Sequence, residues 1–270
     1  MTVTPIQVSS THSTAAKTSG LPVVTWEPLP EDFRLPNDPV DNTGQPLLAG
    51  ALHESLELAG LIQPHMLIAT NFGLCATLNG KFTVKAPDWV YVPNVMPLEA
   101  GVDRKSYTPH LEGDLPVIVM EFLSDEDGEE YSSKQTYPPG KWFFYEQILQ
   151  VPYYAIFEPI SSALELYVLA EGRYQFKASD ENDRNWIAPM NLFLGAWRGE
   201  KEGRNGYWLR WWDADGNILP WAVERLAQEQ QKLAQERRRA EQAEQQRQQL
   251  LDQLRNLDPA QLQALGIHLE

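Results

Sequence analysis

Hydrophobic and polar positions along this chain change their spacing twice, and the changes divide it into regions. From residue 45 to 59, Leu and Ala recur at helical spacing, which predicts an amphipathic helix. Between residues 66 and 177, short apolar runs rich in Val, Ile and aromatic residues are separated by turn residues, which predicts strands. The predicted strands cover 66–78, 81–84, 89–92, 117–124, 151–159, 164–169 and 173–177. The run 117–124 is nearly continuous, as expected for a strand at the centre of a sheet.

Turn residues set the boundaries of these elements. Asn79-Gly80 predicts a tight hairpin, and Asp215-Gly216 predicts another between 207–212 and 217–221. Pro87 interrupts the strand pattern, which favours an edge position or a bulge just before Asp88. After Pro138-Pro139-Gly140, residues 142–150 predict a helix that has Lys141 at its start, with Tyr145 on the same face. The long connection 93–116 is either a surface excursion or a segment that closes over a site.

From Ala222 onward the sequence consists mostly of Gln, Glu, Arg, Ala and Leu, without Gly or Pro before Pro259. This composition predicts a helix over 222–257. One row of positions repeats every seven residues (Leu226, Leu233, Ala240, Arg247 and Leu254), and a second row is more polar (Glu229, Glu236, Ala243, Leu250 and Leu257). The repeat indicates a weakly specified coiled coil and therefore a homo-oligomer. A single solvated helix is the alternative.

Four regions follow from these patterns: an extended or disordered segment (1–40), a folded domain with a Trp-rich C-terminal part (41–221), the long helix (222–257) and a C-terminal tail (258–270). Residues 1–20 lack the apolar core of a signal peptide, and no apolar run reaches the roughly 18 residues that span a bilayer. Cys75 is the only cysteine, so no intramolecular disulfide forms. We therefore expect a cytoplasmic protein without a membrane partner.

The net charge is −15, and nearly all of it lies before Ala222. Such acidity argues against broad, non-specific binding to nucleic acid, which needs a basic face. It does not exclude a metal site that handles phosphate groups locally, because a bound cation changes the local charge.

Three residues supply the candidate chemistry. Glu121 falls inside the most apolar strand, and an ionised carboxylate there is costly unless a cation compensates it. Asp88 precedes another apolar strand, so Asp88 and Glu121 predict a site for Mg²⁺ or Mn²⁺, with Lys141 as the third charge. Lys81 and Lys85 are less favoured candidates for the lysine role. Glu54 or Glu57 of the first helix is either a further ligand or part of a solvated face. A buried Glu121–Lys141 ion pair without any metal is the competing interpretation.

Other chemistry-bearing segments have simpler interpretations. The acidic run 125–130 predicts a solvated turn, with a second metal patch as the less favoured reading. The segment 213–217 resembles a calcium loop, but its glycine is at the fourth position, so we reject that reading. Six of the nine tryptophans lie between Trp186 and Trp221, where they form either a small core or a surface that stacks on sugars.

Three motifs in order carry a family resemblance: Ala86-Pro87-Asp88-Trp89-Val90, then Val119-Met120-Glu121-Phe122-Leu123-Ser124, then Lys141 and Tyr145 with the segment from Val151 to Pro159. Over residues 41–194 the chain resembles the Uma family of putative restriction endonucleases, a branch of the PD-(D/E)XK nuclease superfamily. The resemblance implies an α/β fold, a restriction-endonuclease-like mixed sheet flanked by helices. It also implies Mg²⁺-dependent hydrolysis of DNA. Asp88 and Glu121 take the metal-binding acids, and Lys141 replaces the lysine that the superfamily has at position 123, where this chain has Leu123.

Two other functions remain open at this point. The first is a non-catalytic interaction protein that keeps the nuclease-like fold and oligomerises through its C-terminal helix, which the acidity favours. The second is a carbohydrate-active protein that uses its carboxylates and tryptophans, which would require paired acids about 5–9 Å apart.

Overall fold

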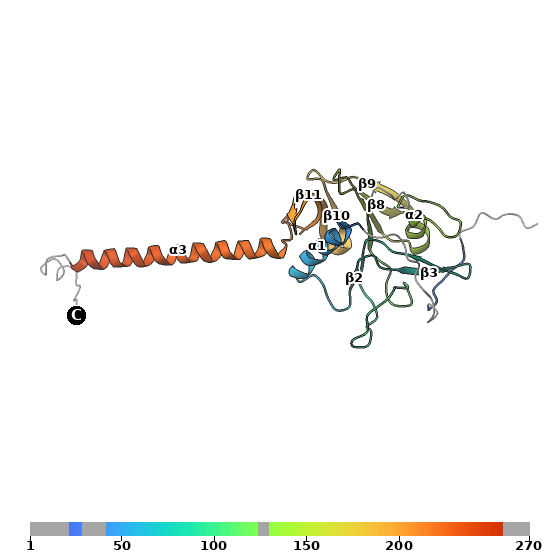
Figure 1. The fold of residues 1–270 in the computed structure, drawn as a ribbon, viewed down its shortest axis with the longest axis horizontal. Coiled ribbons are helices and arrows are strands. Elements are labelled where there is room, and N and C mark those ends of the chain that lie inside the picture. Colours follow the sequence, from blue (N-terminus) through green and yellow to red (C-terminus); the bar gives the residue numbers. More distant parts are fainter. Residues whose placement is uncertain (1–21, 29–41, 124–129, 256–270) are drawn as a thin grey trace, which may run out of the picture.

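A six-stranded mixed sheet organises the domain (Figure 1). The computed structural model describes residues 22–28, 42–123 and 130–255. The strand order in the sheet is β2-β5-β6-β7-β8-β9, and these strands cover Leu67–Ala69, Trp89–Val92, Ile118–Phe122, Tyr153–Phe157, Leu164–Ala170 and Arg173–Lys177. Only β6 and β7 run parallel to each other; the other neighbours in this sheet are antiparallel. The predicted α/β class with a mixed sheet is confirmed.

Two smaller sheets complete the strand content. One contains β1 (Val24–Thr25), β3 (Leu74–Leu78) and β4 (Lys81–Lys85). The other contains β10 (Arg184–Ile187), β11 (Leu192–Lys201) and β12 (Arg204–Trp212). The helices are α1 (Gln45–Leu58), α2 (Lys141–Phe143), the π-helix η1 (Phe144–Leu149), the 3₁₀ turn η2 (Ala188–Met190) and α3 (Ala222–Arg255). Among the described residues, no helix is long and apolar enough to cross a membrane.

Successive side chains along each strand point to opposite faces of the six-stranded sheet. Different elements pack on each face. Trp89 and Met120 point to one face and pack with Leu52 of α1 and Trp208 of β12. Their neighbours Val90 and Val119 point to the other face and pack with side chains of η1, β3 and the Tyr107 loop. Residues of even number on β5 and odd number on β6 therefore share the face that η1 covers.

Several predicted boundaries were wrong for identifiable reasons. The segment 66–78, predicted as one strand, forms β2 and β3 in two different sheets, separated by the turn 70–73. The hairpin predicted around Asp215-Gly216 is a turn that leads to the single bridge Trp212↔Ile218. The strand that pairs with β12 is β11, and the turn between them contains Glu202 and Gly203, both with positive φ.

Other predictions held more closely. The hairpin at Asn79-Gly80 joins β3 to β4, as expected from two residues that both adopt positive φ. The helix predicted over 142–150 is present but is built from α2 and the π-helix η1. One further prediction was wrong: the N-terminal segment, predicted to lack regular structure, contributes the two-residue strand β1 to the edge of a sheet. Trp208, Trp211 and Trp221 are buried with the main core, so these tryptophans form a core and not a sugar-stacking surface.

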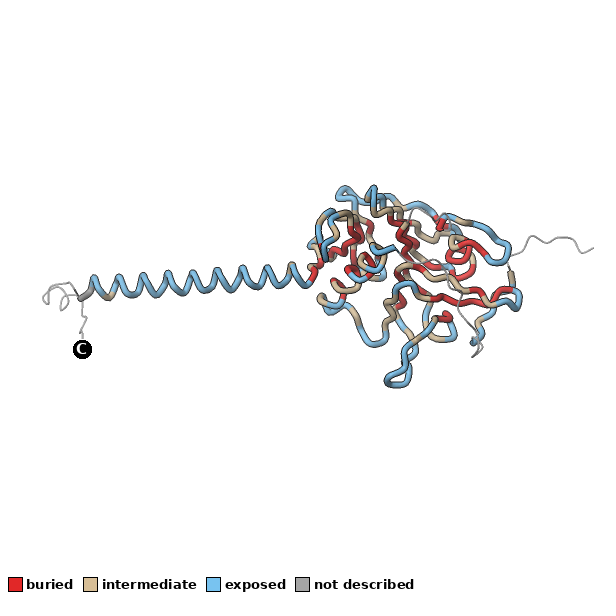
Figure 2. Tube along the Cα trace, in the orientation of Figure 1, coloured by how far each residue is buried: buried red, intermediate tan, exposed pale blue. Residues whose placement is uncertain are grey.

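The helix α3 extends away from the domain as a single rod of 34 residues (Figure 1). Its residues from Arg225 to Leu250 are exposed over the whole length (Figure 2). The tail predicted over 258–270, the acidic run 125–129 and Ser124 lie outside the described residues.

Candidate active site

Asp88 and Glu121 are brought together by the pairing of β5 with β6. Trp89 lies opposite Met120, Val90 opposite Val119 and Tyr91 opposite Ile118 in antiparallel register. One step further, the same register places Asp88 opposite Glu121, on the face that η1 covers. Residues directly opposite each other in such a pair have Cβ atoms about 4.5–5.5 Å apart. The two predicted acids therefore meet on one face of the sheet.

Asp88 stands where regular pairing between the two strands ends. Its Oδ2 atom accepts a hydrogen bond of 2.5 Å from the backbone N–H of Phe122. The chain passes from β4 in one sheet to β5 in another just before Asp88. At this point the Asp88 side chain, and not a backbone carbonyl, accepts the hydrogen bond from Phe122. Asp88 is only partly buried, whereas Glu121 is 1% exposed. The pair combines one acid within the core with one at its boundary.

Lys141 approaches Glu121 from the first residue of α2. Its Nζ atom donates a hydrogen bond of 3.1 Å to Glu121 Oε2, and its side chain is 19% exposed. Tyr145, one turn further in η1, donates a hydrogen bond of 3.0 Å from its hydroxyl to Glu121 Oε1. Both carboxylate oxygens of Glu121 are therefore oriented by side chains from one helical segment. The prediction that Lys141 and Tyr145 share a face is confirmed.

Glu130 also belongs to this cluster, although the sequence around it does not predict that position. Its Oε1 atom lies 3.6 Å from Lys141 Nζ, and its backbone carbonyl accepts a hydrogen bond of 2.9 Å from the Tyr154 hydroxyl. The prediction of a solvated acidic turn is wrong for this residue, which is 3% exposed. Its Oε2 atom has no hydrogen-bond partner among the described residues. In sequence, Glu130 cannot be told apart from the four acids that precede it.

Burial is the largest influence on the pKa of each titratable group in this cluster that shows a shift. Burial raises the pKa of Glu121 to about 8; Lys141 opposes this shift, and Asp88 and Glu130 add to it. Burial alone would lower the pKa of Lys141, but Glu121 and Glu130 outweigh it and raise that pKa above its ordinary value. Burial raises the pKa of Tyr145 well above its usual range, and Glu121 adds to the shift. Lys141 thus interacts directly with Glu121 and lies close enough to Glu130 and Asp88 for their charges to act on it.

Glu54, Glu57 and Lys81, which were also considered from sequence, lie elsewhere. Glu54 lies on α1, on the opposite face of the sheet, and pairs with Lys201 at 2.6 Å. Glu57 is exposed on the same helix and lines a groove beside β2. Lys81 is exposed and lies over the Tyr137 ring, and Lys85 is partly buried at the end of β4. The calcium-loop reading of 213–217 stays rejected, because Asp213 accepts hydrogen bonds from Asp215 and Asn217 within its own turn.

Few side chains at this site could act as metal ligands. Within the part of the chain that the structure describes, no group of three or more His, Cys, Asp or Glu side chains is arranged to hold a metal ion. Mg²⁺ nevertheless fits a site with one or two carboxylates, because it keeps several of its waters. Asp88 and Glu121 meet that requirement, and the raised pKa of Glu121 is the expected consequence of a buried acid that a cation would compensate.

The mixed sheet, with an acid on each of two adjacent strands and a lysine on the following helix, defines the PD-(D/E)XK type of nuclease-like fold. The chain belongs to the Uma2 family, described as putative restriction endonuclease, whose family model matches residues 48–198, more than half of the chain. No curated protein matches the chain. The match ends within β11, so β12 and α3 lie outside it.

Proposed function

We propose that this protein is a divalent-metal-dependent endonuclease that hydrolyses phosphodiester bonds of DNA. The observation that carries the proposal is the convergence of Asp88, Glu121 and Lys141, from three separate segments, on one face of the six-stranded sheet. A buried carboxylate with a raised pKa, next to a second acid and a lysine, is the arrangement expected of a functional site.

Each residue has a distinct part in this proposal. Asp88 and Glu121 hold Mg²⁺ or Mn²⁺, which when bound supplies charge stabilisation at the phosphoryl oxygens and favours loss of a proton from the attacking water. Tyr145 fixes the orientation of the Glu121 carboxylate through its hydroxyl hydrogen bond. Lys141 carries a positive charge beside both acids, where it stabilises the developing negative charge on the phosphate or orients the attacking water.

The acidity of the chain makes the cation central to this function. With a net charge of −15, the protein as a whole repels DNA, so binding depends on local positive charge. Lys141 supplies such a charge beside Glu121, and a divalent ion held by Asp88 and Glu121 would add to it.

A cleavage assay tests the proposal. Supercoiled plasmid and single-stranded DNA would be incubated with the full chain and Mg²⁺ or Mn²⁺, alongside Asp88→Asn, Glu121→Gln and the control Glu57→Gln. We expect metal-dependent cleavage by the wild type and by the control, and a loss of about 100-fold or more in the two site variants. Equal cleavage by wild type and site variants would overturn the assignment of these residues.

The alternative is a non-catalytic interaction protein that retains the nuclease-like fold. The same contacts favour it in part, because Glu121 and Lys141 already compensate each other as a buried ion pair, and the described residues hold no cluster of three metal-ligand side chains. The absence of metal-dependent cleavage and of metal binding in the folded wild-type protein would favour this alternative.

A further inference from the structure

The C-terminal helix α3 presents apolar side chains that the described part of its own domain does not cover. Leu226 and Leu233 are each 56% exposed, and Leu250 is 59% exposed. They recur at heptad spacing on a helix whose other residues are almost all polar. An isolated helix with this stripe gains stability when a partner helix covers it.

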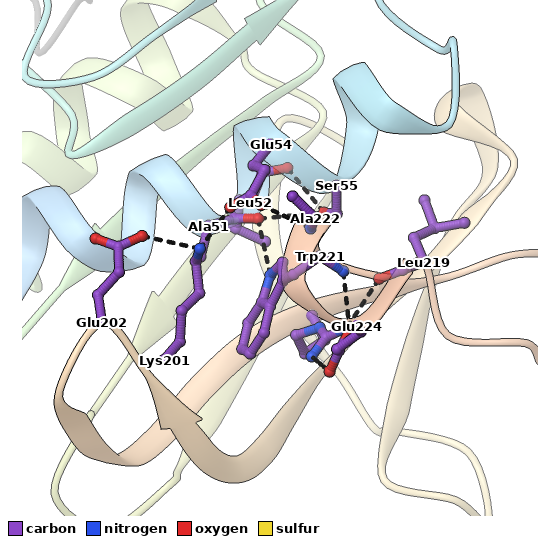
Figure 3. Close-up of polar contacts among 11 residues, drawn as sticks. Ala51, Leu52, Glu54, Ser55, Lys201, Glu202, Leu219, Trp221, Ala222 and Glu224 are labelled. Atoms are coloured by element: carbon purple, nitrogen blue, oxygen red, sulfur yellow. Dashed lines mark hydrogen bonds and ion pairs between the residues drawn. The ribbon is translucent and has the colours of Figure 1, made fainter. Parts of the chain in front are cut away.

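The root of α3 is fixed, which prevents the helix from folding back onto its domain. The Trp221 indole donates to the Ala51 carbonyl at 3.1 Å, and the Ala222 backbone N–H donates to Glu54 at 2.8 Å (Figure 3). Glu224 accepts two hydrogen bonds from the buried Arg210 and one from the Trp221 backbone. The first turn is therefore held to α1 and β12, and the helix projects in one direction (Figure 1). Its exposed stripe is thus presented to a second molecule.

We infer that α3 pairs with α3 of a second copy in antiparallel orientation, centred between Ala240 and Ala243. In this register, Leu233 of one copy packs on Leu250 of the other, and Ala240 packs on Ala243. The two alanines are small and let the helices approach closely at the centre. The next position toward the C-terminus places Arg247 opposite Glu236 of the second copy, so each dimer contains two such pairs of opposite charge.

The flanking positions favour the same orientation. In the antiparallel pair, Arg237 of one copy lies beside Glu244 of the other, again twice per dimer. Among the described residues of one copy, the ion pair of Arg247 is an exposed contact of 3.6 Å with Glu244 in its own helix. Such exposed pairs contribute little, so Arg247 and Glu244 can exchange them for partners on the second copy.

A parallel pair of the same helices is unfavourable. It would place each residue of the stripe against its own copy, so that Glu229, Glu236 and Arg247 would each face an identical charge. It would also bring Lys232 beside Arg237 of the partner. Charged residues at core positions decide the orientation of a coiled coil, because each misplaced pair costs stability. Charge complementarity therefore selects the antiparallel arrangement.

This orientation has a consequence for the two domains. A helix of 34 residues is about 50 Å long, at 1.5 Å per residue. An antiparallel dimer holds one domain at each end of this rod, a separation of about 15 base pairs of duplex. The dimer therefore does not bring two active sites to the same base pair.

Charge exchange at positions 236 and 247 tests the inference on the full chain. In the antiparallel pair, Glu236→Arg and Arg247→Glu each place like charges together, so we expect the dimer dissociation constant to rise at least tenfold in either variant. The double variant Glu236→Arg/Arg247→Glu restores opposite charges and is expected to dimerise within about threefold of the wild type. Sedimentation equilibrium measures the association, and circular dichroism checks that each exposed substitution leaves the protein folded.

A distance measurement gives a second, direct answer. Spin labels on Ala227→Cys lie near the start of each helix, and Cys75 is buried away from the reagent. We expect the labels to be roughly 45 Å apart in the dimer, against less than about 20 Å if the helices are parallel. A short distance, a double variant that stays weak, or a wild-type protein that remains monomeric at about 100 µM would each overturn the inference. None of these readouts depends on nuclease activity.

Discussion

Two buried clusters of charge lie on opposite faces of the six-stranded sheet, and they differ in the direction in which the fold shifts the pKa of their glutamates. On the face covered by η1, Glu121 lies among Asp88, Glu130 and the cation Lys141, and burial raises the pKa of Glu121 to about 8. On the other face, Arg210 is 0% exposed and binds both oxygens of Glu224 at 3.0 and 2.7 Å.

In the Arg210 cluster, Glu224 and two tryptophan rings compensate the charge of the guanidinium, although the Nε atom of Arg210 has no hydrogen-bond partner among the described residues. The Arg210 guanidinium lies 3.6 Å from the centroid of the Trp221 ring and 5.0 Å from that of Trp197. Burial acts to raise the pKa of Glu224, but hydrogen bonds from Arg210 and from the Trp221 backbone outweigh it and lower that pKa below its ordinary value. A carboxylate that the fold keeps ionised indicates a structural pair, and one that the fold makes hard to ionise indicates a site with room for a further cation.

The largest expected effect is a loss of stability when the Arg210 cluster is broken. Replacing Arg210 with Met removes the cation from the root of α3 and leaves the Leu219 carbonyl and Glu224 without their partner. We expect a loss of about 3 kcal/mol in the free energy of unfolding, since breaking a buried pair is costly. Thermal unfolding should show a fall in Tm of about 10 °C. Arg198→Met, an exposed arginine on the neighbouring strand, is the control and should change little.

The second prediction concerns Lys141, where we expect a large loss of cleavage activity and a small loss of stability. Replacing Lys141 with Met removes the lysine that hydrogen-bonds Glu121 but leaves an acid that can take up a proton. We expect DNA cleavage to fall by about 100- to 1000-fold, with Tm changed by only a few degrees. The exposed Lys81→Met is the matched control for charge. Stability losses comparable to those of Arg210→Met would show that Lys141 has a structural role like that of Arg210.

Sequence patterns are sufficient to predict that Glu121 is buried beside Asp88 and Lys141, because the apolar run around Glu121 indicates its burial. Glu121 interrupts an apolar run, so the cost of burying its charge is evident from the sequence alone. Arg210 follows a mixed segment with Gly206 and gives no such signal, although it is as deeply buried as Glu121. The strand β11 was missed for a related reason, since Gly195, Gly199 and charged residues interrupt its alternation. Side-chain partners from separate segments, such as Glu130 in a turn and Lys141 in α2, depend on tertiary packing that local spacing does not encode.

A third prediction concerns pH and metal at the Glu121 cluster. Burial raises the folded, metal-free pKa of Glu121 from the ordinary value of 4.5 to about 8, so Glu121 takes up a proton far more readily than an exposed glutamate. Its contribution to stability is fully present below about pH 4.5 and is lost as pH rises through 8. A metal ion must displace this proton, so its affinity should rise about tenfold per unit of pH up to 8.

Thermal shift with Mn²⁺ at pH 6, 7 and 8 measures this effect. Saturating metal stabilises by about 2.7 kcal/mol at 100 times its dissociation constant, so the Tm shift should grow with pH at a fixed, sub-saturating concentration. Glu121→Gln should abolish the shift at every pH, whereas Glu57→Gln should keep it. A shift that does not depend on pH would mean that Glu121 does not lose a proton when the metal binds.

The smallest expected effect concerns Glu224, whose stability contribution should depend on pH in the opposite direction to that of Glu121. Because its folded pKa lies below the ordinary value, Glu224 contributes stability above about pH 4.5 that is lost as pH falls through the lowered pKa. Glu224→Gln removes the charge while keeping the size of the side chain, and we expect it to cost about 1 kcal/mol near pH 7. The difference between variant and wild type should shrink as pH falls through the lowered pKa of Glu224, because the wild-type carboxyl then also becomes neutral. Urea unfolding at pH 7 and pH 3.5 measures it, with the exposed Glu229→Gln as control. If the difference were the same at both pH values, ionisation of Glu224 would not be what holds α3 to the domain, and the contrast between the two clusters would fail on this face of the sheet.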